Sequence, residues 1–203
     1  MRGRLTHARA SIALLAAWIV LAFATVCAAQ ARSTPAAAVP DDPLGRRGWH
    51  LELTGHGALE TWNYNGNHEE MAGGLAGITY GIRDGLALKI ASPLYYVWQR
   101  GTDGYLFGLT WGVRGRLLRR PRWSAFWEFE VGVSESDTHV PPRGTRFNYL
   151  AIGGGGVTVR LRPGVHALGG LRWVHVSNNS LAGRDRNPDI EAIGPTIGVL
   201  LGF

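Results

Sequence analysis

Cysteine and charged residues are both scarce in this chain of 203 residues. One cysteine excludes a scaffold held together by disulfides. Charged side chains make up 18% of the chain, below the roughly 25% that is usual in soluble globular proteins. The chain has instead 29 glycines and 8 tryptophans, an odd combination for a helical enzyme because glycine weakens helix interiors. These features favour an all-β protein of one domain with an unusual surface.

Residues 1–31 have the features of a secretory signal peptide. Three arginines precede an apolar run over 11–26, and small residues follow that run. We predict cleavage near Ala29 or Ala31, which removes the cysteine from the mature chain. One alternative is a retained transmembrane helix, for which the apolar run is barely long enough. Another is a lipid anchor on Cys27, which the bulky preceding valine disfavours.

Loss of the signal peptide changes the charge, because its three arginines have no acidic counterpart. The formal net charge falls from +6 to +3, and this weakens the case for nucleic acid as a partner. Residues 32–47 contain three prolines, a run of alanines and two aspartates. We interpret them as a disordered lead-in to a domain at 48–203.

The domain shows the period-two alternation of β-strands. Eight segments do so, at 48–58, 72–82, 85–98, 104–118, 123–134, 147–162, 164–176 and 192–203. Tight turns alternate with longer polar loops, which lie at 59–71, 99–103, 135–146 and 177–191. This alternation is typical of a bacterial outer-membrane protein whose short turns lie in the periplasm. We therefore predict an eight-stranded antiparallel transmembrane β-barrel.

The two faces of each predicted strand differ in the size of their side chains. In the last strand, large aliphatic and aromatic residues alternate with glycine and threonine. The lumen of eight strands is too narrow for so many large side chains, whereas small residues and paired charges fit there. We predict that the apolar face meets lipid. Inside the barrel, Arg114 and Arg116 are expected to pair with Glu128 and Glu130.

Two short motifs suggest a phosphate-binding loop and a zinc site, but neither is complete. The run Gly153–Gly156 is not followed by the lysine and hydroxyl residue of a phosphate loop, so we expect a kink or a close strand contact. The sequence His68-Glu69-Glu70 lacks the second histidine of a zinc helix and lies in a predicted loop. Neither motif predicts a metal site or a cofactor site.

Three polar residues stand at lipid-facing positions near the loop end of the last two strands. His175 and Ser177 are two residues apart on one strand, so their side chains share a face. Glu191 starts the same face of the final strand. A serine with a histidine base and a carboxylate is the arrangement of an esterase triad. The alternative is that these residues lie at the membrane interface, wetted by lipid headgroups.

The run His175-Val176-Ser177-Asn178, followed by Asn187-Pro188-Asp189-Ile190-Glu191, resembles the lipid A 3-O-deacylase (PagL) family of eight-stranded outer-membrane barrels. The local resemblance covers residues 171–203. It implies that His175 is the general base, Ser177 the nucleophile, Glu191 the acid that orients the imidazole, and Asn178 an oxyanion-hole contributor. The chain departs from the family at Ser180, where a small glycine is expected, and in a loop about two residues longer.

The resemblance implies hydrolysis of the ester-linked 3-hydroxyacyl chain at position 3 of lipid A. No cofactor and no metal is needed for that reaction. The implied partners are lipid A or lipopolysaccharide and the outer membrane, with the active site facing the outer leaflet and a homodimer left open. One alternative is a non-catalytic barrel, either an adhesin or a membrane-stabilising protein. A lipid A acyltransferase is a third interpretation, although it requires an internal acyl pocket.

Overall fold

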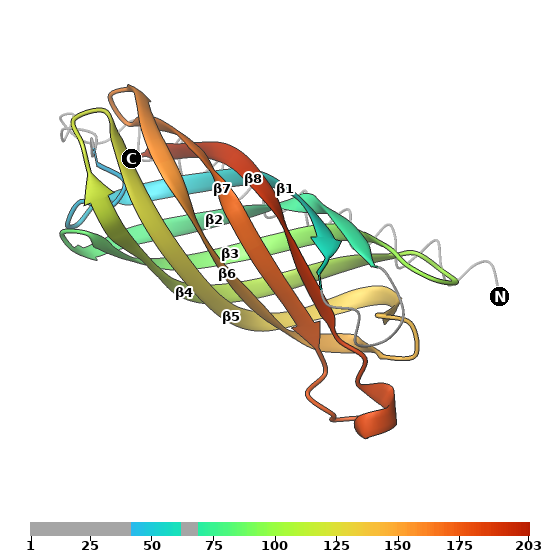
Figure 1. The fold of residues 1–203 in the computed structure, drawn as a ribbon. Coiled ribbons are helices and arrows are strands. Elements are labelled where there is room, and N and C mark those ends of the chain that lie inside the picture. The colour runs from blue at the N-terminus through green and yellow to red at the C-terminus, as the bar shows by residue number, and fades with distance from the viewer. Residues whose placement is uncertain (1–41, 62–68) are drawn as a thin grey trace, which may run out of the picture. The chain divides into compact units, whose positions relative to one another are not determined.

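The computed structural model describes residues 42–61 and 69–203 of the chain (Figure 1). The predicted signal peptide, the first ten residues of the predicted lead-in and His68 lie outside the described residues. Among the described residues, no helix is long and apolar enough to cross a membrane.

Eight antiparallel strands form one closed barrel, in which each strand pairs with the next and β8 pairs with β1. The strands are β1 Trp49–Glu60, β2 Glu70–Arg83, β3 Leu86–Trp98, β4 Gly104–Arg119, β5 Trp123–Val140, β6 Thr145–Arg162, β7 Val165–Ser177 and β8 Ile190–Gly202. The short 3₁₀-helix η1, Arg184–Arg186, lies between β7 and β8. The predicted fold class and strand number are confirmed.

Short turns gather at one end of the barrel and longer connections at the other, as the sequence predicts. Figure 1 shows the β7–β8 loop, with η1, projecting beyond the strand ends on the loop side. One predicted loop is much shorter than expected, because β5 continues to Val140 and β6 begins at Thr145. Residues 135–139 are polar on both faces and so lack the alternation of a membrane strand. A hairpin that stands in water can pair its backbone without that alternation.

Exposure alternates along the strands with the parity that the sequence predicts. On β8, Ile197 is 74% exposed, whereas its neighbour Thr196 is buried. On β4, Trp111 is 50% exposed and Thr110 is fully buried. An outward row of large apolar side chains requires an apolar surrounding, which a lipid bilayer provides.

The lumen holds a cluster of three basic and three acidic side chains, all buried. The cluster consists of Glu52, Lys89, Arg114, Glu128, Glu130 and Arg172. Lys89 Nζ lies 2.8 Å from a carboxylate oxygen of Glu130, and a guanidinium nitrogen of Arg172 lies 2.7 Å from Glu128. Equal numbers of opposite charges compensate one another, which makes burial of all six tolerable.

The expected pairing of luminal charges is correct for Arg114, which contacts Glu128. It is wrong for Arg116, which instead contacts Asp42 at 2.7 Å and Asp84 at 3.0 Å. Arg116 lies near the turn end of β4, beyond the reach of the central cluster. Its partner Asp42 belongs to the segment that precedes β1.

Residues 42–47 differ from the disordered lead-in that we expect from composition. Leu44 is only 2% exposed and packs in an apolar cluster with Phe126, Leu168 and other luminal residues at the turn end. The backbone N–H of Gly85 donates to Leu44 O at 2.8 Å. The buried side chain of Leu44 and the ion pair between Asp42 and Arg116 hold this segment across the turn end of the barrel.

The glycine run in β6 marks a close contact between strands, which is one of the two expected explanations. Gly156 pairs with Gly170 of β7. A Cβ atom at Gly156 would lie 2.3 Å from Gly169 O, and one at Gly170 would lie 2.3 Å from Gly155 O. Larger residues therefore cannot occupy this pair without moving the strands apart.

Candidate functional site

The three residues predicted as a triad lie at the loop end of β7 and β8. His175 and Glu191 are direct partners in the antiparallel ladder of these strands, and Ser177 is the last residue of β7. His175 and Glu191 are half-buried on the outward face, whereas Ser177 is 7% exposed. The period-two geometry of the strands puts these residues on one face of neighbouring strand ends. The expectation that Ser177 meets lipid is wrong, because its side chain is buried and bonded to Asn187 and Asn179 of the β7–β8 loop.

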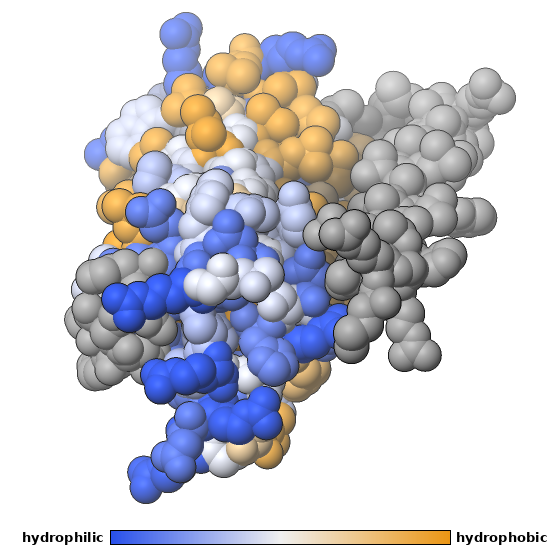
Figure 2. Space-filling model, turned by 90° about the vertical axis from the view of Figure 1, so that its right-hand side faces the viewer, coloured by the Kyte–Doolittle hydropathy of each residue, from blue (hydrophilic) through white to orange (hydrophobic). Residues whose placement is uncertain are grey.

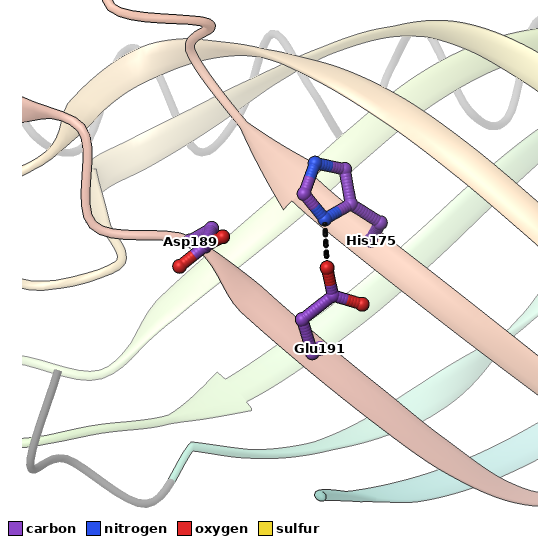
Figure 3. Close-up of side chains that lie close together, drawn as sticks. All are labelled: His175, Asp189 and Glu191. Atoms are coloured by element: carbon purple, nitrogen blue, oxygen red, sulfur yellow. Dashed lines mark hydrogen bonds and ion pairs between the residues drawn. The ribbon is translucent and has the colours of Figure 1, made fainter. Parts of the chain in front are cut away.

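The imidazole of His175 is bonded to the carboxylate of Glu191. The distance from His175 Nδ1 to Glu191 Oε1 is 2.7 Å, and Figure 3 shows the carboxylate directed at the ring. The indole N–H of Trp173 donates to the other carboxylate oxygen at 2.5 Å. The Trp173 and His175 rings also stack, with 5.9 Å between centroids. Both oxygens of Glu191 are thus engaged, which fixes the orientation of the carboxylate and of the imidazole.

The hydroxyl of Ser177 is directed at the β7–β8 loop. Ser177 Oγ donates to Asn187 Oδ1 at 3.0 Å and accepts a hydrogen bond from Asn179 N at 3.1 Å. The hydroxyl therefore bonds with Asn187 rather than with His175 in this structure. Because His175 and Ser177 share a face, a rotation about the Cα–Cβ bond of the serine is the movement that would turn its hydroxyl toward the imidazole.

Asn178 anchors the loop that follows β7. Its side-chain amide donates to Thr145 Oγ1 at 3.0 Å and to Arg186 O at 2.6 Å, and its backbone N–H donates to Asn187 Oδ1 at 3.0 Å. The role of Asn178 in an oxyanion hole stays a prediction. The side-chain amide of Asn178 is bonded to Thr145 and Arg186, so its backbone N–H, which directly follows Ser177 in the chain, is the better candidate donor to an oxyanion.

Two residues near the site have roles that the sequence pattern does not reveal. Trp173 shares the parity of His175, which places it on the lipid face, but its bond to Glu191 depends on the pairing register of β7 and β8. Asn187 occurs in the motif that resembles the deacylase family, yet its contact with Ser177 depends on the fold of a loop. Parity is the signal that the sequence offers for Trp173. For Asn187 the sequence offers the motif, which does not specify the contact with Ser177.

Ser180 adopts a backbone conformation that glycine favours. Its φ is 61°, and that of the preceding Asn179 is 50°. Asparagine tolerates this left-handed region better than serine does. The departure from the family at Ser180 therefore falls at a position where the chain turns sharply after the candidate nucleophile.

The loop end of the barrel is hydrophilic around the site. Figure 2, viewed from the side of the long loops, shows hydrophilic residues across the middle of the face and hydrophobic residues toward its upper edge. Five arginines at this end are exposed, namely Arg100, Arg143, Arg146, Arg184 and Arg186. The candidate site thus lies where the lipid-facing wall meets a polar rim that carries exposed arginines.

No protein-family model matches the chain, and no curated protein matches it. Among solved structures, the barrel is similar to Neisserial surface protein A, with a TM-score of 0.60 and 11% identity over 76% of this chain and 97% of that chain. A comparison with the outer membrane protein OprG from Pseudomonas aeruginosa gives a TM-score of 0.49 and 12% identity, over 80% of this chain and 99% of that chain.

Identities this low show the fold alone. The closed ladder, the outward apolar rows and the similarity to Neisserial surface protein A define an eight-stranded antiparallel β-barrel of the outer-membrane type. Membrane association and a place in the bacterial outer membrane fit that fold.

Proposed function

We propose that this barrel is a lipid A 3-O-deacylase, a carboxylic ester hydrolase with Ser177 as nucleophile, His175 as base and Glu191 as the orienting acid. The observation that carries the proposal is the 2.7 Å bond between His175 Nδ1 and Glu191 Oε1 on the outward face, where His175 precedes Ser177 by two residues on β7. An ordered acid and imidazole beside a serine is the arrangement that activates a hydroxyl for acyl transfer.

The position of the site favours a lipid ester as substrate. His175 and Glu191 lie on the outer wall at the loop end, the level at which lipid headgroups meet the acyl chains. An ester of lipid A in the outer leaflet reaches this wall by lateral diffusion, without leaving the membrane. The exposed arginines of the rim are suited to its phosphates, because guanidinium groups bind phosphate oxygens through paired hydrogen bonds.

Catalysis begins when the Ser177 hydroxyl turns from Asn187 toward Nε2 of His175. Nε2 accepts the hydroxyl proton while Oγ attacks the ester carbonyl, and Glu191 stabilises the imidazolium through Nδ1–H. Collapse of the tetrahedral intermediate releases the sugar hydroxyl, which takes the proton from His175, and leaves an acyl-serine. A water molecule, deprotonated by His175, then attacks the acyl-serine, and His175 returns the proton to Ser177 Oγ as the 3-hydroxy fatty acid leaves.

Asn187 and the backbone of Asn178 are the groups placed to stabilise the oxyanion. Asn187 Oδ1 accepts from both Ser177 Oγ and Asn178 N, so its side-chain amide lies beside the nucleophile. When the serine hydroxyl leaves Asn187, the amide can turn its N–H₂ toward the developing negative charge. Donors held at such a position commonly contribute about 10²–10³ in kcat.

A non-catalytic barrel, either an adhesin or a membrane-stabilising protein, is the second candidate. It is favoured by the bond of the Ser177 hydroxyl to Asn187, because a permanently engaged hydroxyl is no nucleophile. An acyltransferase with an internal acyl pocket has less support. The described part of the lumen is filled by the buried charge cluster and by apolar side chains such as Tyr95 and Leu106.

Mass spectrometry of lipid A from cells that express the chain tests the proposal. Expression of the wild type should remove one 3-hydroxyacyl chain from position 3, and His175→Asn should not. Glu191→Ala should retain partial activity, because orienting the imidazole contributes less than supplying the base. Lipid A that stays unmodified by a folded wild-type barrel, over several acyl compositions, favours the non-catalytic alternative.

A further inference from the structure

Asp189 lies beside the His175–Glu191 pair but has no place in the predicted triad. His175, Asp189 and Glu191 each offer one ligand atom, and these three atoms lie within 4.8 Å of one another. Figure 3 shows Asp189 just before β8, on the same side as the imidazole and the Glu191 carboxylate. All three residues are half-buried, so an ion from the aqueous side can reach them.

The donor set matches zinc better than the harder divalent cations. Zinc binds imidazole nitrogen and carboxylate oxygen at about 2.0–2.2 Å, and open sites supply three protein ligands and leave a fourth position for water. In a tetrahedral site with these bond lengths two ligand atoms lie about 3.4 Å apart, so ligand atoms within 4.8 Å of one another need to approach by at most about 1.4 Å. Calcium and magnesium prefer six or more oxygen ligands, and an imidazole is a poor substitute.

The surroundings also suit a dication. Two carboxylates and a neutral imidazole supply a formal charge that balances Zn²⁺. The indole N–H of Trp173 holds Glu191 Oε2 at 2.5 Å, which directs Oε1 toward the imidazole. Metal-binding carboxylates are commonly oriented by such a donor outside the coordination sphere.

We propose that His175, Asp189 and Glu191 form a zinc-binding site, and that zinc bound there blocks the esterase. The inhibition of the esterase by zinc rests on the proposed function. Zinc at Nδ1 replaces the bond to Glu191 and leaves the imidazole proton on Nε2, whereas zinc at Nε2 occupies the lone pair itself. In either case the Ser177 hydroxyl loses its proton acceptor.

Isothermal titration calorimetry tests the site independently of catalysis. The mature barrel, produced without a polyhistidine tag and stripped with a chelator, is titrated with zinc chloride in detergent micelles. One zinc ion should bind per barrel, and Asp189→Asn and His175→Asn should each weaken binding roughly tenfold or more. Ser177→Ala should bind zinc as the wild type does, because the serine supplies no ligand.

His139→Asn is the matched control, since His139 is an exposed histidine near the loop end of β5. Its zinc affinity should equal that of the wild type. Absence of saturable zinc binding, or an unchanged affinity in Asp189→Asn, would overturn the site.

The inhibitory role is measured as the ratio of esterase rates with and without zinc, taken within each variant. The wild type should lose most of its rate at a zinc concentration at which Asp189→Asn keeps most of its own. A wild-type barrel that binds zinc and hydrolyses ester at an unchanged rate contradicts the inhibition. A barrel that binds zinc but never hydrolyses ester supports the metal site and contradicts the proposed function.

Discussion

Trp173 and Glu191 are joined across β7 and β8 by a hydrogen bond of 2.5 Å from indole Nε1 to carboxylate Oε2. The second oxygen of the same carboxylate bonds to His175 at 2.7 Å. Glu191 is thus held from two directions by residues of one strand face. This relationship gives a structural reason for the imidazole orientation, and it can be tested without altering the triad.

Trp173→Phe keeps an aromatic ring on the lipid face but removes the indole N–H. We expect kcat to fall about tenfold with KM little changed, since a hydrogen bond to a charged group contributes about 1.5–3 kcal/mol and this site is partly exposed. Steady-state kinetics on a lipid ester in micelles measures both constants. Trp111→Phe, on the outward face of β4, should leave kcat unchanged, and an equal loss in the two variants would contradict the role of Trp173.

Asn187→Asp preserves the acceptor atom that engages Ser177 and Asn178, but it replaces an amide donor by a negative charge. If Asn187 faces the oxyanion, kcat should fall by about a hundredfold or more while the barrel stays folded. Heat-modified mobility in gel electrophoresis reports folding alongside the rate. Activity close to that of the wild type would show that Asn187 only accepts hydrogen bonds.

Arg172→Met removes one cation from the luminal cluster, where Arg172 contacts Glu128 at 2.7 Å. The buried carboxylates then outnumber the cations, and such an uncompensated charge costs about 3–5 kcal/mol of folding free energy. The midpoint of urea-induced unfolding in lipid vesicles should fall accordingly. Arg184→Met, in the exposed η1 segment, is the matched control and should keep the wild-type midpoint.

The carboxyl group of Glu69, which precedes β2, is expected to make stability depend on pH. Burial and the neighbouring Glu60 carboxylate raise the pKa of Glu69 from the ordinary value of 4.5 to about 8. Between these values the unfolded chain is ionised at Glu69 while the folded barrel stays protonated, so stability falls as the pH rises through the interval. Above about 8 the loss is complete.

Unfolding midpoints measured from pH 5 to pH 9 test this expectation. Glu69→Gln should remove the decline, whereas Glu70→Gln, at the exposed start of β2, should keep it. A wild-type midpoint that is constant over this range would contradict the raised pKa.

The barrel could be predicted because membrane strands obey a strict parity. Eight apolar rows and the alternation of connection lengths fix strand number and direction, and closure of the ladder follows. The parity rule does not apply where strands leave the membrane, and for that reason residues 135–140 were predicted as loop. It also says nothing of Leu44, whose burial depends on how the turn end is covered.

The candidate site could be predicted in part. Parity and strand pairing bring His175 and Glu191 together, since the two residues are direct partners in the ladder. The direction of the Ser177 hydroxyl depends on Asn187, which stands in a loop whose shape no periodic pattern encodes. The partners of the luminal charges depend likewise on which strands face one another across the lumen.

We propose that Ser177 hydrolyses the ester at position 3 of lipid A. The most direct measurement is the mass spectrum of lipid A incubated with purified wild type and with Ser177→Ala, both verified as folded barrels. The wild type should release one 3-hydroxy fatty acid, and Ser177→Ala should release none, because no other hydroxyl takes the place of an aligned nucleophile. Release of the same fatty acid by the Ser177→Ala barrel would contradict the account.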